Sequence, residues 1–159
     1  MSSDSATKTT LAPGLNPTVF ARILEEGYGP GAWHGPDLKA AVADVTADTA
    51  FRRPGPGRHN IAEIVLHHTW FVRSVVSQLT GRAPEPFLVK GEDWFELGEG
   101  QGPSWPAIRR ALEAYQQQLA GAIDSTLPEG ERFDLIMGIT CHAVYHAGQI
   151  QLVKRLVEQ

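Results

Sequence analysis

The sequence has almost no cysteine, no excess of basic residues and no long apolar run, and each absence excludes a class of protein. The 159 residues include one cysteine, Cys141. An internal disulfide is therefore excluded, and a reducing, cytoplasmic location is expected. The formal net charge of −4 argues against nucleic acid as the main partner, because nucleic-acid-binding domains usually carry a basic surface. No apolar run approaches the roughly 20 residues that span a bilayer, so no membrane partner is expected.

The first 15 residues differ in character from the rest of the chain. They are polar and lack the apolar centre of a secretory signal, so residues 1–15 are predicted to form a disordered arm. The whole chain is 42% hydrophobic and 20% charged, as is usual for a globular protein. Residues 16–159 are long enough to bury a core, and they are predicted to form a single domain.

Apolar residues recur at helical intervals in four main segments, and no pair of convincing alternating strands is present. Potential N-caps precede three of these segments: Asn16, Asn60 and Ser104. The predicted fold is therefore an all-α bundle of four main helices. The main helices are expected at residues 18–26, 60–81, 104–123 and from about 131 to the C-terminus, with short helical pieces after residue 36 and at 46–50.

The second and third main helices are joined by a long connection, Arg82–Pro103. It is rich in proline, glycine and acidic residues, around the aromatic residues Phe87, Trp94 and Phe95. Connections of this length are uncommon in a compact domain and are often functional. We expect this one to cover a cavity or a partner surface.

Two histidines, His142 and His146, lie four residues apart in the helical segment CHAVYHAGQIQL. At about 100° per residue, this spacing puts both side chains on nearly the same face, one turn apart. Two imidazoles in this arrangement can bind one metal ion. Both lie within or beside the apolar stripe of the last helix, where a buried imidazole needs a polar partner. The alternative is a pair of core histidines that are hydrogen-bonded to neighbouring side chains.

A third histidine ligand is available on the helix predicted at residues 60–81, where His67 and His68 are adjacent. Catalytic zinc sites commonly use three protein ligands and leave a position open, whereas structural sites use four. Helical projection puts His68 at the centre of the apolar stripe and His67 at its edge. Periodicity alone therefore favours His68.

Three segments together resemble the DinB-like (DinB/YfiT-like) superfamily of metal-dependent enzymes. They are AWHGPDL, RPGPGRHNIAEIVLHH and ITCHAVYHAGQIQLVKR, between about residues 32 and 155. The resemblance implies a four-helix bundle that binds a divalent metal through three histidines. Matched position by position, it implies that the ligands are His67, His142 and His146. The family usually has an apolar residue at the position of His68, which remains the alternative ligand.

The resemblance also implies a cofactor and an activity. Three neutral imidazoles suit a first-row ion such as zinc or nickel. Characterised relatives include S-transferases that use low-molecular-weight thiols such as mycothiol or bacillithiol. The expected function is therefore metal-dependent thiol transfer, or a related reaction, on a small-molecule substrate, and a homodimer is expected. The alternative is a non-catalytic bundle with a structural or stress-linked ion, and a fourth protein ligand such as His68 or His34 would favour it.

Two polar residues are positioned to orient the imidazoles. Gln149 follows His146 by three residues, and Glu63 lies one turn before His67. Each has a competing role. Gln149 can be an amide that faces solvent or another helix, and Glu63 can form a capping box with Asn60.

Two residues beside His142 limit the chemistry further. The residue after it is Ala143, where the HExxH motif of zinc peptidases has its glutamate general base. Peptide hydrolysis of that type is therefore not expected. Cys141 projects about 100° away from His142 along the helix, and it is predicted to be a small buried residue.

Overall fold

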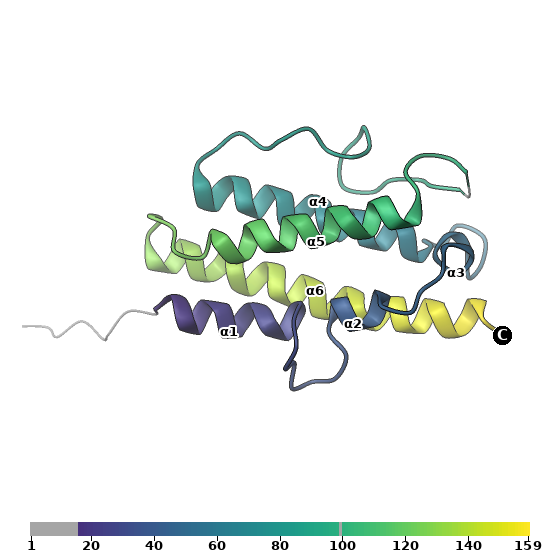
Figure 1. Ribbon diagram of the computed structural model, residues 1–159, viewed down its shortest axis with the longest axis horizontal. Coiled ribbons are helices and arrows are strands. Elements are labelled where there is room, and N and C mark those ends of the chain that lie inside the picture. Colours follow the sequence, from purple (N-terminus) through teal and green to yellow (C-terminus); the bar gives the residue numbers. More distant parts are fainter. Residues whose placement is uncertain (1–15, 99) are drawn as a thin grey trace, which may run out of the picture.

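The computed structural model describes residues 16–98 and 100–159 (Figure 1). This part of the chain contains α-helices and no β-strand. The predicted all-α class is therefore confirmed. The predicted disordered arm, residues 1–15, lies outside the described residues. Within the described residues, no helix has the length and apolar character needed to cross a membrane. The helices are α1 (Pro17–Gly27), α2 (Leu38–Val42), α3 (Ala47–Phe51), α4 (Ile61–Thr80), α5 (Trp105–Gly121) and α6 (Glu129–Val157).

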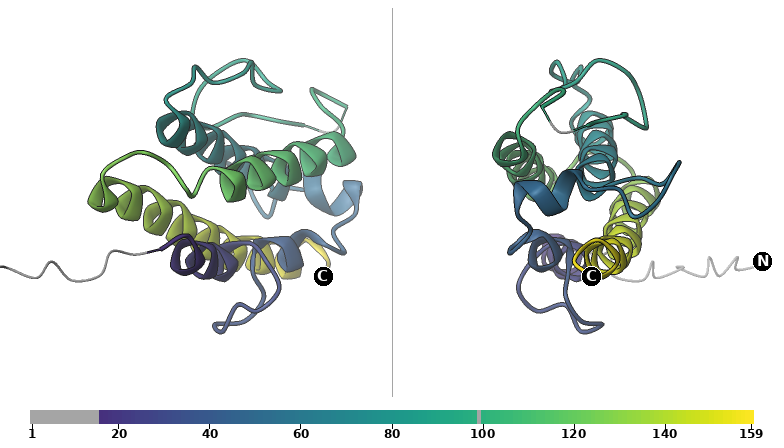
Figure 2. Two further views of the ribbon diagram at one scale, coloured as in Figure 1. Left: turned by 60° about the vertical axis from the view of Figure 1, so that its left-hand side comes forward. Right: turned by 90° about the vertical axis from the view of Figure 1, so that its right-hand side faces the viewer.

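The three longest helices, α4, α5 and α6, run alongside one another (Figures 1 and 2). Helix α4 packs against both α5 and α6, and α1 packs against α6. The short α2 also packs against α6, so α1 and α2 follow each other along the same long helix (Figure 1). The small α3 contacts α4, α5 and α6 at one end of the molecule.

Side-chain caps set the starts of several helices, as the sequence predicts. At α4, Asn60 and Glu63 form a reciprocal capping box, and Gly81 ends the helix with a φ of 66°. Ser104 caps α5 through a hydrogen bond from a backbone N–H. Helix α6 differs from the prediction, because it begins at Glu129 with no side-chain cap. Its start therefore carried no capping signal in the sequence.

Buried apolar residues form two clusters. One cluster joins α2, α3 and the first part of α4 to the start of α5 and the second half of α6. The other joins α1 and the second part of α4 to the end of α5 and the first part of α6. Polar residues fall between the two clusters along α4, α5 and α6, among them His67, His68, Gln116 and His142. The site therefore lies in a polar layer at the middle of the molecule.

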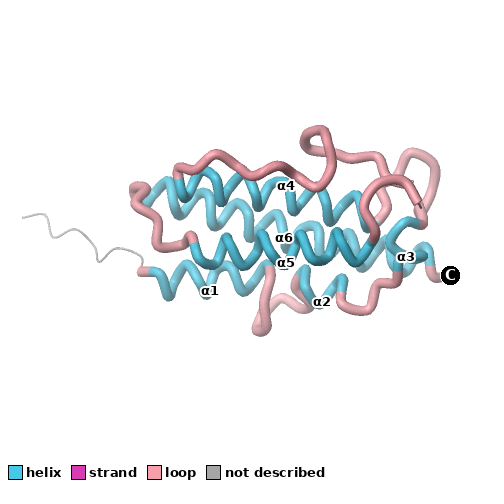
Figure 3. Tube along the Cα trace, turned by 45° about the horizontal axis from the view of Figure 1, so that its top comes forward, coloured by secondary structure: helices cyan, strands magenta, loops and turns pink. Residues whose placement is uncertain are grey.

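The connection between α4 and α5 runs back over α4 (Figures 1 and 3). It is anchored in the core, because Phe95 and Leu97 are buried. The backbone N–H of Leu97 donates to the Glu63 carboxylate at 2.7 Å, and its carbonyl accepts from the Asn60 side chain at 2.8 Å. These bonds fix the connection to the start of α4 and hold its preceding residues over the histidines.

Candidate metal centre

Three histidines from two helices bring their Nε2 atoms together. The Nε2 of His142 on α6 lies 3.1 Å from the Nε2 of His67 on α4 and 3.1 Å from the Nε2 of His146. One candidate ligand nitrogen from each residue lies within 4.8 Å of the other two. His67 and His146 are buried, and His142 is half-buried. The structure therefore brings the three sequence-predicted ligands to one point at the contact between α4 and α6.

The spacing of these nitrogens fits a first-row metal ion. With Zn–N distances of about 2.0–2.1 Å, neighbouring ligand nitrogens lie roughly 3.3–3.4 Å apart in a tetrahedron and about 2.9 Å apart at right angles. The observed 3.1 Å separations fall between these two values. The two pairs that include His142 therefore already have a spacing suited to a divalent ion.

His67 is oriented by the long connection. Its Nδ1 lies 2.9 Å from the backbone carbonyl oxygen of Asp93 and 3.0 Å from the Asp93 carboxylate. A carbonyl oxygen only accepts, so Nδ1 carries the ring proton and the lone pair is on Nε2. Asp93 has a φ of 62°, and among the described residues it is the only one other than glycine with a positive φ. Such conformations are uncommon and often occur at functional sites.

His146 is oriented from its own helix. Its Nδ1 lies 2.7 Å from Oε1 of Gln149, and the amide nitrogen of Gln149 donates to the hydroxyl of Tyr145 at 3.0 Å. This leaves the lone pair of His146 on Nε2. The contact corresponds to the orienting role considered for Gln149, rather than to a solvent-facing amide.

His68 lies behind His142 and outside the group of converging nitrogens. Its Nδ1 is 2.8 Å from Nδ1 of His142, and its Nε2 is 3.0 Å from the side-chain amide of Gln116. His68 is fully buried, as its central place in the apolar stripe predicts. The more peripheral His67 is the residue that faces α6. Helical projection thus identified the more buried histidine, whereas the family resemblance identified the one that meets His142 and His146.

Glu63 takes the capping role, and its carboxylate makes no hydrogen bond to His67. Its carboxylate accepts from the backbone N–H groups of Asn60 and Leu97 and from Arg53, and Nδ1 of His59 lies 2.9 Å away. Burial raises the pKa of Glu63, but these hydrogen bonds outweigh burial and leave the pKa lowered. Glu63 is therefore an ionised anchor for the start of α4.

Trp94 covers one side of the site. Its ring stacks on His67 at a centroid distance of 3.8 Å and on His59 at the same distance, with interplanar angles of 7° and 9°. Trp94 therefore fixes the plane of the His67 imidazole. Sequence analysis placed neither Asp93 nor Trp94 at the site, and the unusual length of their connection was the one indication of a functional role.

The environment keeps the three imidazoles neutral. Burial lowers the pKa of His142 to about 3, with further contributions from His146 and His67. Burial also lowers the pKa of His146 to about 4, although its hydrogen bond with Gln149 opposes the change. Burial lowers the pKa of His67 as well, against the opposing effect of Asp93. At neutral pH each ring is therefore uncharged and has one nitrogen lone pair that it can offer to a cation.

A pocket of about 610 Å³ is connected to the candidate metal centre through two of its lining residues, although none of the three converging histidines lines it. Two of its lining residues contact ligand rings: Trp94 stacks on His67, and Gln149 bonds to His146. Arg58 also lines it, and the described residues provide this guanidinium with no ion pair. Its remaining walls are mainly aliphatic and include Ile64, Leu152, Val153 and Leu156.

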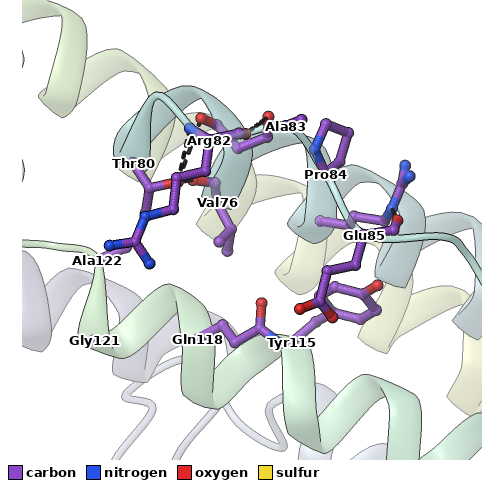
Figure 4. A pocket seen from close by; sticks show the side chains of 12 residues that line it. Val76, Thr80, Arg82, Ala83, Pro84, Glu85, Tyr115, Gln118, Gly121 and Ala122 are labelled. Carbon is purple, nitrogen blue, oxygen red and sulfur yellow. Dashed lines mark hydrogen bonds between the residues drawn. The ribbon is translucent and has the colours of Figure 1, made fainter.

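A separate pocket of about 390 Å³ lies between the end of α4, the following connection and α5 (Figure 4). Arg82 and Glu85 line it from the connection, and Tyr115 and Gln118 line it from α5. None of its lining residues bonds to the three converging histidines or stacks on them, unlike Trp94 and Gln149 in the larger pocket. It is therefore not part of the candidate metal centre.

Cys141 lies next to His142 in the sequence but is exposed. The prediction that this residue is buried was wrong. The apolar stripe of α6 continues through Ile139 and Ala143, and Cys141 projects away from it to solvent. The site described above does not include this thiol.

Comparison with known proteins identifies the family. The profile of the DinB superfamily matches residues 32–150, a segment that contains His67, His142 and His146. No curated protein and no solved structure gives a match. The match spans most of the chain and includes the motif segments from AWHGPDL to HAVYHAGQI. The chain belongs to the DinB superfamily.

Proposed function

We propose that this protein binds one divalent ion, zinc or nickel, through His67, His142 and His146 and acts as a metal-dependent thiol S-transferase or a closely related enzyme. The observation that carries the proposal is the meeting of three Nε2 atoms, one from each neutral imidazole. The Nδ1 atoms of His67 and His146 donate to the Asp93 carbonyl oxygen and to Oε1 of Gln149, respectively. This arrangement is typical of imidazoles that bind a metal through Nε2.

Coordination by three protein ligands favours an enzyme over a purely structural ion, because positions remain for a small molecule. The two candidates for a fourth ligand are engaged elsewhere. Both nitrogens of His68 have partners, and Nε2 of the exposed His34 lies 2.7 Å from the carbonyl oxygen of Glu26. Within the described residues, the group of candidate ligands contains three histidines and no fourth member.

The chemistry follows from the open positions. When bound, the ion would lower the pKa of a coordinated thiol and so supply a thiolate nucleophile near neutral pH. The chain itself orients two of the imidazoles through these contacts: Asp93 and the stacked Trp94 hold His67, and Gln149 holds His146. Gln149 and Trp94 also form one edge of the adjoining pocket.

The acceptor substrate is assigned to this 610 Å³ pocket. Its aliphatic wall, with the exposed Leu152 and Leu156, suits an apolar body. The Arg58 guanidinium in its lining suits an anionic group. In the proposed reaction the thiol loses its proton, the thiolate sulfur forms a bond to an electrophilic carbon of such a molecule, and the leaving group on that carbon departs with its bonding electron pair.

The experiment that tests this proposal is a thiol-transfer assay on zinc- or nickel-loaded protein. Bacillithiol and mycothiol would be offered with a fluorogenic bimane electrophile, and thiol consumption would be followed. We expect turnover by the wild type and by His34→Ala, and its loss in His146→Ala and after chelation. If the loaded wild type is no faster than His146→Ala with either thiol, the enzyme proposal fails and the non-catalytic alternative takes its place.

A further inference from the structure

A buried chain of hydrogen bonds leads away from the metal centre through His142. It runs from Nδ1 of His142 to Nδ1 of His68 at 2.8 Å, and from Nε2 of His68 to the side-chain amide of Gln116 at 3.0 Å. His68 is 0% exposed and Gln116 is 9% exposed. The chain crosses from α6 through α4 to α5 in the polar layer between the two apolar clusters. Beyond His142, this chain of hydrogen bonds consists of the His68 imidazole and the Gln116 amide.

The direction of one hydrogen bond in this chain fixes the direction of the others. A neutral imidazole has one N–H donor and one nitrogen acceptor. If Nε2 of His142 carries the proton, its Nδ1 must accept from His68, and Nε2 of His68 must accept from the NH₂ of Gln116. If Nδ1 of His142 carries the proton, both bonds reverse and the Gln116 oxygen must accept. Gln116 can serve either direction, because its amide offers a donor and an acceptor at nearly the same position.

The groups around His142 favour one direction of these hydrogen bonds when no cation is present and the opposite direction when a cation is bound. The Nε2 atoms of His67 and His146 are both acceptors, since their Nδ1 protons point to the Asp93 carbonyl and to Gln149. Without a cation, Nε2–H of His142 has two acceptors at 3.1 Å and donates to them. With a cation at the three Nε2 atoms, Nε2 of His142 must instead be a lone pair.

We propose that the chain His142–His68–Gln116 reverses its hydrogen-bond direction when the three Nε2 atoms hold a divalent cation, with the Gln116 amide turning over to accept. This inference rests on the proposed metal site and assigns His68 and Gln116 as positioning residues for it. The proton between the two Nδ1 atoms passes from His68 to His142. The Nε2 proton of His142 leaves to solvent, and Nε2 of His68 takes one from solvent. Each imidazole keeps one proton, so the net charge of the chain is unchanged.

A positioning role for His68 explains why this polar residue occupies an otherwise apolar position on α4. His68 lies at the centre of the apolar stripe of α4, where an aliphatic side chain would pack without any polar group to satisfy. An aliphatic residue there would leave Nδ1–H of His142 without its acceptor in the cation-bound form. The Gln116 side chain makes no other hydrogen bond to the described residues, so its amide can turn without breaking one.

Nitrogen-15 NMR of the histidine rings tests the reversal directly, since each tautomer has a distinct pattern of ring-nitrogen shifts. In the zinc-free wild type we expect the proton on Nε2 of His142 and on Nδ1 of His68. After one equivalent of zinc we expect it on Nδ1 of His142 and on Nε2 of His68. If zinc binds while His68 keeps the same tautomer in both forms, this inference is overturned and the proposed metal site stands. If the wild type binds neither zinc nor nickel, the proposed function fails together with this inference.

Zinc affinity, measured by competition with a chelator, provides the second test. Gln116→Met and His68→Leu should each lower the affinity by about 10- to 100-fold, the usual effect of removing a partner of a ligand imidazole. The double variant should lose no more than His68→Leu alone, because both residues act through one chain. Gln118→Met, an exposed change on the same helix, is the control and should bind as the wild type. The proposal would be overturned if the losses of zinc affinity in the two single variants added up in the double variant. It would also be overturned if Gln116→Met bound zinc as tightly as the wild type while its zinc-free circular dichroism stayed helical.

Discussion

The imidazoles of the candidate site are oriented by three different kinds of hydrogen-bonding partner. A backbone carbonyl holds His67, a side-chain amide holds His146, and a second imidazole lies behind His142. The first partner belongs to a connection, the second to the same helix as its histidine, and the third to a neighbouring helix. The three rings are therefore positioned independently, so the loss of one partner should weaken the site and leave the other two contacts in place.

Replacement of Gln149 by alanine tests one of these contacts. Gln149→Ala removes the acceptor at 2.7 Å from Nδ1 of His146, and we expect zinc affinity to fall by about 10-fold or more. Chelator competition measures the effect. Gln151→Ala, which changes a half-buried glutamine of the same helix without a bond to the histidines, is the control. Equal affinities in the two variants would show that Gln149 does not orient His146.

The buried carboxylate of Glu63 should contribute to stability in a pH-dependent way. Burial raises its pKa, but hydrogen bonds from Arg53, the Leu97 N–H and His59 leave the pKa lowered. Because the folded-state pKa is lower than the unfolded value of about 4.3, the contribution is present above that value and is lost as the pH falls through the folded pKa. At pH 7, Glu63→Gln should lower the free energy of unfolding by about 2 kcal/mol.

Urea unfolding at several pH values measures this contribution. The difference in free energy of unfolding between wild type and Glu63→Gln should shrink as the pH falls below about 4. A difference that stays constant down to about pH 3 would mean that the charge of Glu63 is not what stabilises the start of α4.

At the scale of elements, α1 approaches α6 closely at a glycine. A Cβ added at Gly27 would lie 2.8 Å from Cβ of Ala143 and 3.1 Å from the carbonyl oxygen of Thr140. Gly27→Ala should therefore lower the free energy of unfolding by about 1–3 kcal/mol through overpacking. At Gly138, also helical, an added Cβ meets nothing within 4 Å. Gly138→Ala should leave stability unchanged or raise it by up to about 1 kcal/mol. Equal effects in urea unfolding would contradict this close packing.

The helices could be predicted from the sequence because their signals are local. Asn60 with Glu63 and the terminal Gly81 define α4, and the four-residue spacing of His142 and His146 places both on one face of α6. The start of α6 was predicted less well, because no side chain caps it. Periodicity and caps depend on residues that are close in the sequence. They therefore predict where helices lie better than they predict which helices contact one another.

The site could be predicted only in part, since some of its members meet through tertiary packing. The choice of His67 over His68 required the family resemblance, because projection measures burial and does not show which helix a side chain faces. Asp93 and Trp94 reach His67 from 26 and 27 residues further along the chain, through an irregular connection with no periodic pattern. Gln116 meets His68 across two helices. None of these three contacts has a signal in the local sequence.

At the scale of the whole molecule, the metal should stabilise the fold without being required for it. Both apolar clusters are packed by residues other than the three candidate ligands. Zinc at 100 times its dissociation constant would add about 2.7 kcal/mol to the free energy of unfolding, or roughly 5–11 °C in Tm for a chain of this size. Chelation should lower Tm by that amount and leave far-UV circular dichroism helical. Loss of helix on chelation would instead indicate a structural ion.

The assembly of the molecule stays a prediction. The family resemblance implies a homodimer, and α6 exposes the apolar side chains of Leu152 and Leu156. The same two residues line the pocket beside the histidines. Their exposure is therefore accounted for by the proposed substrate pocket and does not by itself require a second copy of the chain.

Metal content tests the central claim most directly. Untagged protein would be loaded with zinc or nickel, freed of excess ion and analysed by elemental mass spectrometry beside His146→Ala and His34→Ala. We predict about one divalent ion per chain in the wild type and in His34→Ala, and its loss in His146→Ala, because His146 supplies one of the three converging nitrogens. A wild type that retains neither zinc nor nickel would contradict the account, and so would a His146→Ala variant that retains the ion as tightly as the wild type.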